Sequence, residues 1–213
     1  MLNQLLKLML KETYITLLTK YSNNNNLIND LWTEIEISYS NKKRYYHTLQ
    51  HLDNLLLQLT QVKSEIVSWD TVLFSLYYHD IIYNSLKSDN EEKSAEVAET
   101  RMKQISVPVL IIKNCKEQIL ATKKHLSNSD EDTNYFTDAD LSILGQDWNT
   151  YSAYYKNVRK EYSIYPDLIY NPGRKKVLKH FLDMERIFKT EYFYSTLEQP
   201  AKRNIEMELQ SLS

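Results

Sequence analysis

Glycine and proline are scarce in this chain of 213 residues, which has two glycines, Gly145 and Gly173, and four prolines. Open α/β folds, β-sandwiches and β-barrels need glycine for tight turns and for loops that wrap around phosphate groups. The scarcity argues against those folds and favours long helices. One large hydrophobic core is feasible at this length, and no internal repeat or composition shift marks a domain boundary. We therefore expect an all-α fold, with residues 1–213 forming a single-domain helical bundle.

Cysteine and net charge are also low. Cys115 is the single cysteine, so no intrachain disulfide can form, which suits a reducing cytoplasm as the location of the protein. The formal net charge is −2, and a chain in which acidic and basic residues are so nearly balanced has no general attraction for polyanions. The composition therefore argues against nucleic acid as an obligate partner and leaves a homo-oligomer open.

The N-terminus is rich in leucine but lacks an uninterrupted apolar run. Polar residues from Asn3 to Glu12 break it repeatedly, and no small-residue cleavage site follows, so we expect neither a signal peptide nor a membrane span. Apolar side chains nevertheless gather on one helical face, which predicts an N-terminal docking helix within residues 1–25. The residues on that face are Leu2, Leu5, Leu6, Met9, Leu10 and Leu17.

Helical periodicity continues along the rest of the chain. The segment 65–83 is apolar on most sides and is expected to be the most buried helix. Ser88 and Glu91 form a capping box that predicts a helix start at Ser88. We expect loops at 127–134 and at Asn171-Pro172-Gly173, and a final helix that starts at Pro200. The other predicted helices cover about 27–39, 48–62, 88–105, 108–125, 139–144, 147–162 and 174–188.

His79 and Asp80 follow the apolar run Val72–Tyr78 directly. An imidazole beside a carboxylate in a buried position is destabilising unless something compensates it, and a bound metal ion is the simplest compensation. His47 and His51 are four residues apart, so on a helix they would project from one face. In isolation such a pair is more often a pair of surface or capped histidines.

Asp138 and Asp140 supply two further carboxylates. For Asp138, a role as a helix cap or first-turn acid is as good an explanation as a role in the site. Two imidazoles with two carboxylates suit Mn, Fe, Co, Ni or Zn, with Mg possible, as one ion or two. A mixed set of this kind leaves coordination positions for water and substrate, which favours Lewis-acid hydrolysis over a structural role.

The order His51, His79-Asp80, Asp140 resembles the H…HD…D signature of the HD superfamily of metal-dependent phosphohydrolases. Further segments are similar to a bacterial subfamily of predicted HD phosphohydrolases, and the resemblance spans about Leu31 to Leu209. It implies an HD-type helical domain. The segments are Arg44–His51, Tyr78–Tyr83, Asp89–Ala95, Leu120–His125, Asp138–Gly145, Val158–Tyr162 and Glu198–Asn204.

The resemblance implies a role for each matching residue. His51, His79, Asp80 and Asp140 would be the metal ligands, with Asp80 counted also among the catalytic residues. The segment around His47 is similar to that of cyclic-nucleotide phosphodiesterases, which makes His47 a candidate general acid. His125 and Asp138 are candidates for a second metal or for support of the ligands.

Arg44, Lys123 and Lys124 are candidate contacts for substrate phosphate, since anionic oxygens develop in the transition state. For the two lysines, simple solvated charges are the stronger alternative. The expected function is hydrolysis of a phosphomonoester, phosphodiester or pyrophosphate of a small substrate such as a nucleotide, by a water that the metal activates. The alternatives are a non-catalytic nucleotide-binding or regulatory module and, more distantly, a di-iron oxygenase.

Overall fold

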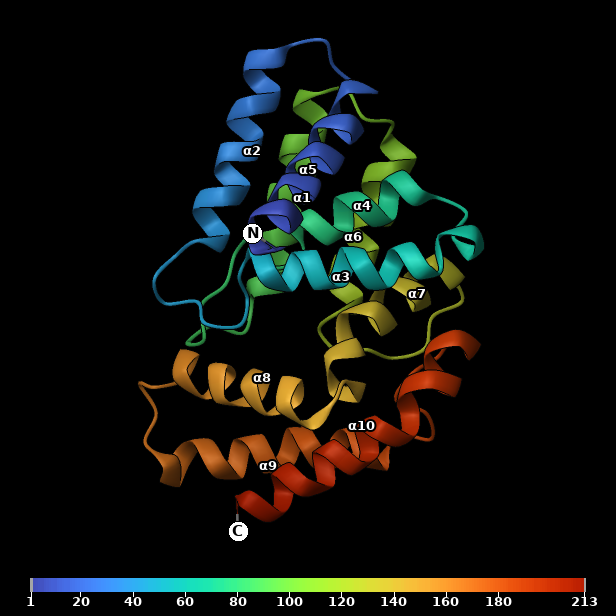
Figure 1. Cartoon of the computed structure of the whole chain (residues 1–213). Coiled ribbons are helices and arrows are strands. Elements are labelled where there is room, and N and C mark those ends of the chain that lie inside the picture. Colours follow the sequence, from blue (N-terminus) through green and yellow to red (C-terminus); the bar gives the residue numbers. More distant parts are fainter. Residues whose placement is uncertain (1, 213) are drawn as a thin grey trace. The chain divides into compact units, whose positions relative to one another are not determined.

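The computed structural model describes the backbone of residues 2–212 and the side chains of residues 9–212. Over this range the chain forms helices and no strand, which confirms the all-α prediction (Figure 1). The HD-type arrangement stays a prediction. The helices are α1 (Leu2–Thr19), α2 (Asn25–Tyr39), α3 (Leu49–Gln61), η1 (Lys63–Glu65), α4 (Trp69–Tyr78), α5 (Asn90–Gln104), α6 (Val109–Ala121), α7 (Glu131–Leu141), η2 (Ser142–Gly145), α8 (Trp148–Glu161), α9 (Asp167–Asp183) and α10 (Glu191–Ser211), with η marking 3₁₀-helices.

The chain divides into two compact units, and the division falls inside α7, after Thr137. The first unit contains α1 to α6 and the first part of α7. The second contains the end of α7, η2 and α8 to α10. The single domain expected from the sequence stays a prediction.

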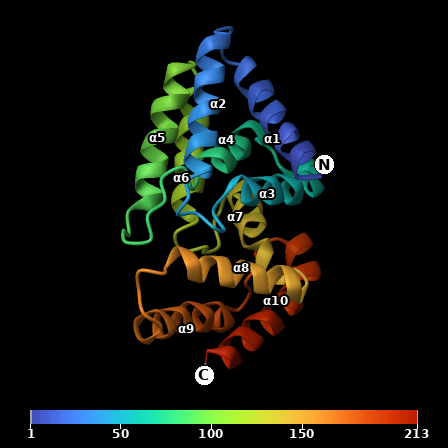
Figure 2. The same cartoon turned by 60° about the vertical axis from the view of Figure 1, so that its left-hand side comes forward.

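Helix α4 is the centre of the first unit. It buries every residue from Thr71 to Tyr78 and packs against α1, α3, α5 and α6, while α5 and α6 lie side by side (Figure 2). The Ser75 hydroxyl, the polar group within this run, donates to Gln118 Oε1 at 2.7 Å. The burial predicted for the fourth helical segment is thereby confirmed.

Helix α1 docks onto α2, α3 and α4 as the sequence predicts. Leu10 and Leu17 are buried, and the Tyr14 and Tyr78 hydroxyls lie 2.7 Å apart in the interior. Met9 was predicted on the docking face but is 53% exposed. The side chains of Leu2, Leu5 and Leu6 lie outside the described residues.

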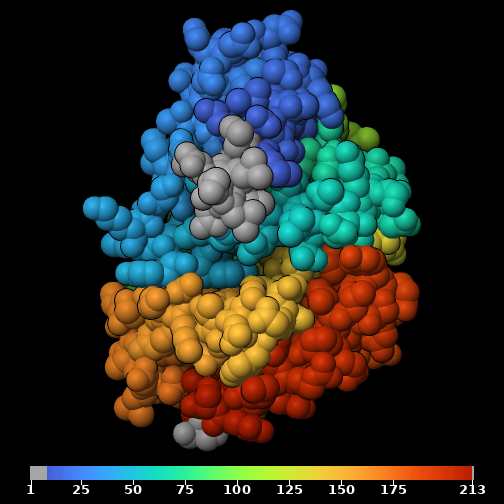
Figure 3. Space-filling model, in the orientation of Figure 1, coloured from blue at the N-terminus to red at the C-terminus, as the bar shows by residue number. Residues whose placement is uncertain are grey.

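Helix α2 covers one side of this unit with an amphipathic face. Its start is fixed by the Asn24 side chain, which accepts a hydrogen bond from the Leu27 N–H at 3.1 Å. Its outer face is part of the blue surface in Figure 3. The buried residues of its inner face recur at helical spacing, and Tyr39 is the last of them, so its side chain lies in the core. The buried residues of α2 are Ile28, Leu31, Trp32, Ile35 and Tyr39.

Several predicted helix ends are wrong. Helix α4 ends at Tyr78, five residues early, so Asp80 lies beyond the helix instead of in its last turns. Helix α5 begins at Asn90 with Asp89 in the cap position, so the Ser88 capping box does not form. Helix α6 ends at Ala121, before His125. The predicted loop at 127–134 is helical from Glu131 onward.

Two prolines lie inside helices where the sequence predicted a break or a start. Pro172 is within α9 and Pro200 is within α10. A proline lacks the N–H that would bond to the carbonyl four residues earlier. Here those earlier residues, Leu168 and Thr196, are exposed, so water can serve their carbonyls and both helices continue.

The second unit is held together by a buried polar network and a close backbone approach. Arg174 donates to both carboxylate oxygens of Glu208, at 2.7 and 2.9 Å, and the Tyr151 hydroxyl donates to the same carboxylate at 2.5 Å. At Gly145, an added Cβ would lie 2.6 Å from Leu197 Cβ. A glycine is therefore required where η2 meets α10.

Within residues 2–212, none of the helices combines the length and apolar character that a membrane crossing requires.

Candidate metal centre

His51 and His79 are buried and face each other from α3 and from the end of α4. Their Nε2 atoms lie 3.1 Å apart. The other ring nitrogen of His79, Nδ1, lies 3.0 Å from the Leu76 carbonyl oxygen. Because a carbonyl only accepts, Nδ1 carries a proton, so Nε2 is the ring nitrogen that presents a lone pair once it is deprotonated. This tautomer is the one that a metal ligand requires.

Asp80 brings a carboxylate to the same point. Its Oδ2 lies 3.0 Å from His79 Nε2 and 3.8 Å from His51 Nε2. His47 Nε2 is 3.9 Å from the same oxygen. Burial acts to raise the pKa of Asp80, but positive charge on His79, His47 and His51 outweighs it and holds that pKa well below its usual range. Asp80 is therefore an anionic donor at neutral pH.

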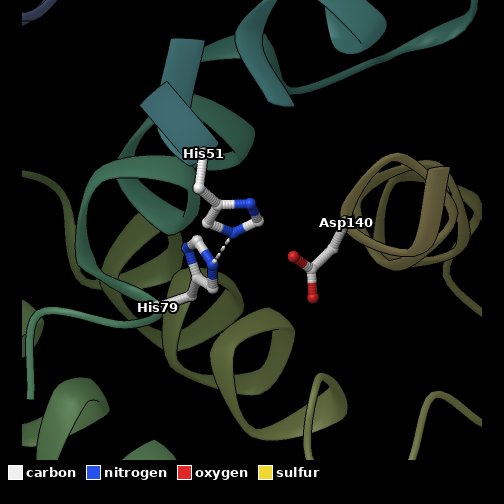
Figure 4. A group of neighbouring side chains, drawn as sticks. All are labelled: His51, His79 and Asp140. Atoms are coloured by element: carbon white, nitrogen blue, oxygen red, sulfur yellow. Dashed lines mark hydrogen bonds between the residues drawn. The ribbon is translucent and has the colours of Figure 1, made fainter. Parts of the chain in front are cut away.

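Asp140 projects from the last turn of α7. One of its carboxylate oxygens and one ring nitrogen each of His51 and His79 all lie within 4.8 Å of one another. Figure 4 shows the carboxylate directed toward the two rings. Within the first unit, the Phe136 ring of α7 packs edge-on against the His79 ring, with the ring centroids 5.8 Å apart.

The donor set fits a divalent transition metal. Metal–nitrogen bonds of about 2.0–2.1 Å place neighbouring ligand nitrogens about 3.0–3.4 Å apart, and the two histidine nitrogens are 3.1 Å apart. Lone pairs that meet at this distance repel unless a proton or a cation lies between them. His51, His79 and Asp140 could therefore hold a metal ion, and Asp80 lies within reach as a fourth ligand.

His47 lies two residues before α3, so the two histidines do not share a helical face, although their rings remain close. Its ring centroid is 5.9 Å from that of His51. The ring stacks on Tyr83, with centroids 4.1 Å apart and planes inclined by 28°. The side chain is 20% exposed. A histidine held in this way can meet solvent and still face Asp80.

Arg44 directs its hydrogen bonds to backbone carbonyls. Nη1 donates to the oxygens of His47 and Asp80, and Nη2 donates to the oxygen of Ile81. The residue is 9% exposed. Its contact with substrate phosphate stays a prediction. The bonds to the carbonyls show that the guanidinium also holds the backbone at His47, Asp80 and Ile81.

Asp138 is fully buried and accepts hydrogen bonds within the second unit. Its carboxylate accepts from the Lys189 N–H at 3.0 Å, the Thr190 N–H at 2.7 Å and the Thr190 hydroxyl at 2.8 Å. Lys189 Nζ lies 3.3 Å away. Burial raises the pKa of Asp138, and these partners only partly offset the rise. The geometry supports an anchoring role for Asp138, and its part in a second metal site stays a prediction.

Lys123, Lys124 and His125 follow the end of α6. Lys123 donates to the Ser88 carbonyl oxygen at 2.6 Å and pairs with Glu92. Lys124 is exposed, and both lysines border a surface cavity of about 220 Å³. His125 is half-buried with φ of 50°, in the left-handed region. Their roles at phosphate or at a second metal stay predictions.

Sequence reasoning missed two residues beside these groups. The hydroxyl of Tyr39 accepts a hydrogen bond from the Asp80 N–H at 3.2 Å. Lys189 is 5% exposed and contributes positive charge near Asp138 and Asp140. Neither residue belongs to a recognisable motif, and both come from segments more than 40 residues from their partners.

Comparisons with protein-family models, with curated proteins and with solved structures find no match for this chain. The functional interpretation therefore depends on the site's own geometry together with the motif resemblance.

Proposed function

We propose that this chain is a metal-dependent phosphohydrolase that cleaves a phosphate ester or pyrophosphate of a small substrate, such as a nucleotide. The observation that carries the proposal is the convergence of His51, His79 and Asp140 donor atoms within 4.8 Å, with the Asp80 carboxylate 3.0 Å from His79. Three of these residues come from segments far apart in the sequence, and their order matches the H…HD…D pattern.

The donors suit a catalytic site better than a closed structural one. Four nitrogen and oxygen ligands from the protein would leave positions for water and a phosphate oxygen on a six-coordinate ion, and three would leave one position on a tetrahedral ion. A bound divalent ion would supply Lewis acidity, which lowers the pKa of water and offsets negative charge on phosphate. The ionised Asp80 carboxylate would hold this ion and orient a water through its second oxygen.

His47 would supply the proton for the leaving group. An imidazole titrates near neutrality, which suits proton transfer at physiological pH. The Tyr83 stack fixes its plane, while its partial exposure leaves room for a substrate oxygen. Protonation of the leaving oxygen by a positioned side chain contributes about 10²- to 10⁴-fold to the rate.

The experiment combines metal analysis with phosphate release. Protein purified without chelator is loaded with Mn²⁺, Co²⁺ or Zn²⁺ and tested on aryl phosphates, nucleotides, cyclic nucleotides and pyrophosphate. Asp80→Ala should lose both metal and activity. His47→Ala should keep metal and lose about 10²- to 10⁴-fold in kcat. His180→Ala, an exposed histidine on α9, is the matched control and should change neither.

The proposal fails if protein with stoichiometric metal cleaves none of these substrates. Tight nucleotide binding without turnover would then favour the regulatory module. Bound iron with oxygen consumption would favour the oxygenase.

A further inference from the structure

Asp80 lies beyond Tyr78, the last residue of α4. The His79 N–H donates to the Ser75 carbonyl at 2.9 Å and the Ile81 N–H donates to the Tyr78 carbonyl at 3.2 Å, whereas the N–H of Asp80, between them, bonds to a side chain. The N–H and the carbonyl of Asp80 both bond to side chains from before α3. The N–H donates to the Tyr39 hydroxyl at 3.2 Å, and the carbonyl accepts from Arg44 Nη1 at 2.7 Å.

Tyr39 is itself held in place. It is 1% exposed, and its hydroxyl donates to the Tyr77 carbonyl at 3.1 Å while it accepts from Asp80. The hydroxyl thus donates to the last turn of α4 and accepts from Asp80, the second residue after that helix.

Arg44 connects this turn to His47. Nη1 donates to the His47 carbonyl at 3.2 Å as well as to Asp80, and Nη2 donates to the Ile81 carbonyl at 2.9 Å. The guanidinium carbon lies 4.8 Å from the Tyr39 ring centroid and 5.5 Å from that of Tyr83. Rings at these distances hold the plane of the guanidinium by cation–π contact.

We propose that Tyr39 and Arg44 form a clamp that positions the Asp80 carboxylate and sets its distance from His47. This inference rests on the proposed function for its catalytic consequence. Arg44 and Tyr39 are positioning residues, since they act through the backbone of the residues that carry chemistry. Ligand geometry must be held to within about 0.5 Å to be productive, so loosening this turn weakens metal binding and turnover together.

The clamp differs from a phosphate contact in what a substitution changes. A guanidinium that binds substrate phosphate mainly sets KM, and its loss leaves the metal ligands in place. A guanidinium that holds the Asp80 turn sets metal affinity and kcat. Both hydrogens of Nη1 and one of Nη2 go to backbone carbonyls, which supports the second role.

Arg44→Lys and Tyr39→Phe test the clamp. Lysine keeps the charge but cannot bond to three carbonyls in one plane. Phenylalanine keeps the ring and removes only the hydroxyl. Arg101→Lys and Tyr14→Phe are matched controls, because Arg101 pairs with Glu34 and Tyr14 bonds to Tyr78, and neither bonds to the Asp80 turn. Co²⁺ and Mn²⁺ titration and amide hydrogen exchange of metal-free protein are measured for all four.

We expect each clamp variant to bind metal about 10- to 100-fold more weakly, the usual effect of removing a group that orients a ligand. In metal-free protein, Tyr39→Phe should speed exchange of the Asp80 amide, while the Tyr14→Phe control leaves it unchanged. Where turnover is measured, kcat should fall with KM nearly constant.

Unchanged metal affinity and unchanged Asp80 exchange in both variants would overturn the clamp, as would a rise in KM alone for Arg44→Lys. The exchange measurement needs neither metal nor substrate. It therefore decides the clamp even if the protein hydrolyses no phosphoester, and a failure of the proposed function is seen separately.

Discussion

His51 Nε2 and His79 Nε2 lie 3.1 Å apart in the interior of the first unit. The Leu76 carbonyl holds a proton on Nδ1 of His79, which leaves Nε2, once deprotonated, as the nitrogen that can bind a cation. Two such nitrogens beside the Asp80 carboxylate form an arrangement that a shared cation stabilises.

Asp138→Asn should destabilise the protein with or without metal. The substitution removes the charge that pairs with buried Lys189 and one of the oxygens that accept from Thr190. A buried donor left unsatisfied costs about 1–3 kcal/mol. Chemical denaturation of metal-free protein measures the change. Asp147→Asn is the control, because Asp147 is an exposed cap of α8 and asparagine caps equally well. Equal stability of Asp138→Asn and the control would refute the anchoring role.

Gly145→Ala should destabilise the second unit. Its Cβ would meet Leu197 Cβ at 2.6 Å and the Leu197 carbonyl oxygen at 2.8 Å, and the backbone of α10 cannot yield as a side chain can. Overpacking of this kind costs about 1–3 kcal/mol.

Gly173→Ala is the opposite case. Nothing lies within 4 Å of the added Cβ, and the residue is inside α9. Alanine should stabilise this helix by about 0.5–1 kcal/mol. Thermal melts of the two variants should therefore shift in opposite directions, and a loss of stability at both glycines would contradict the packing described for Gly145.

Cys115 should resist thiol reagents in the native protein. The residue is fully buried, and burial raises the pKa of its thiol to about 12. Thiolate is the reactive form, so modification at pH 8 should require unfolding.

The same shift predicts a pH dependence of stability. The folded pKa lies above the ordinary value of about 9, so the favourable contribution of the protonated thiol is complete below pH 9 and is lost as pH rises toward 12. Cys115→Ala should flatten this alkaline loss. Rapid native-state labelling at pH 8 would contradict the burial.

The sequence predicted the helical class and the burial of α4, because apolar periodicity and scarce glycine report on packing directly. It could not predict where α4 ends. The apolar pattern continues through Ile81 and Ile82, and the end is set by tertiary bonds from Tyr39 and Arg44, which local sequence does not encode. The prolines inside α9 and α10, Pro172 and Pro200, were mispredicted for a related reason. Leu168 and Thr196 are exposed, so water can serve the carbonyls that lose their partners, and local sequence does not encode that exposure.

At the site, His51, His79 and Asp140 could be predicted because their residue types and order form a recognisable pattern. Arg44 stands out in the sequence for its charge, whereas in the structure its guanidinium bonds to three backbone carbonyls. Tyr39 has no signal of its own, since a tyrosine ending an amphipathic helix is ordinary core. Residues that position others are therefore the part of the site that only three-dimensional contacts reveal.

We propose that His51, His79 and Asp140 bind one metal ion with Asp80 nearby. Titration of Mn²⁺, Co²⁺ and Zn²⁺ into metal-free wild type, His79→Ala, Asp140→Asn and the control His180→Ala measures this binding. We predict stoichiometric binding by wild type and His180→Ala, and affinity at least about 100-fold lower in the two ligand variants. Full affinity in Asp140→Asn or His79→Ala, or no binding by wild type, would refute this metal site.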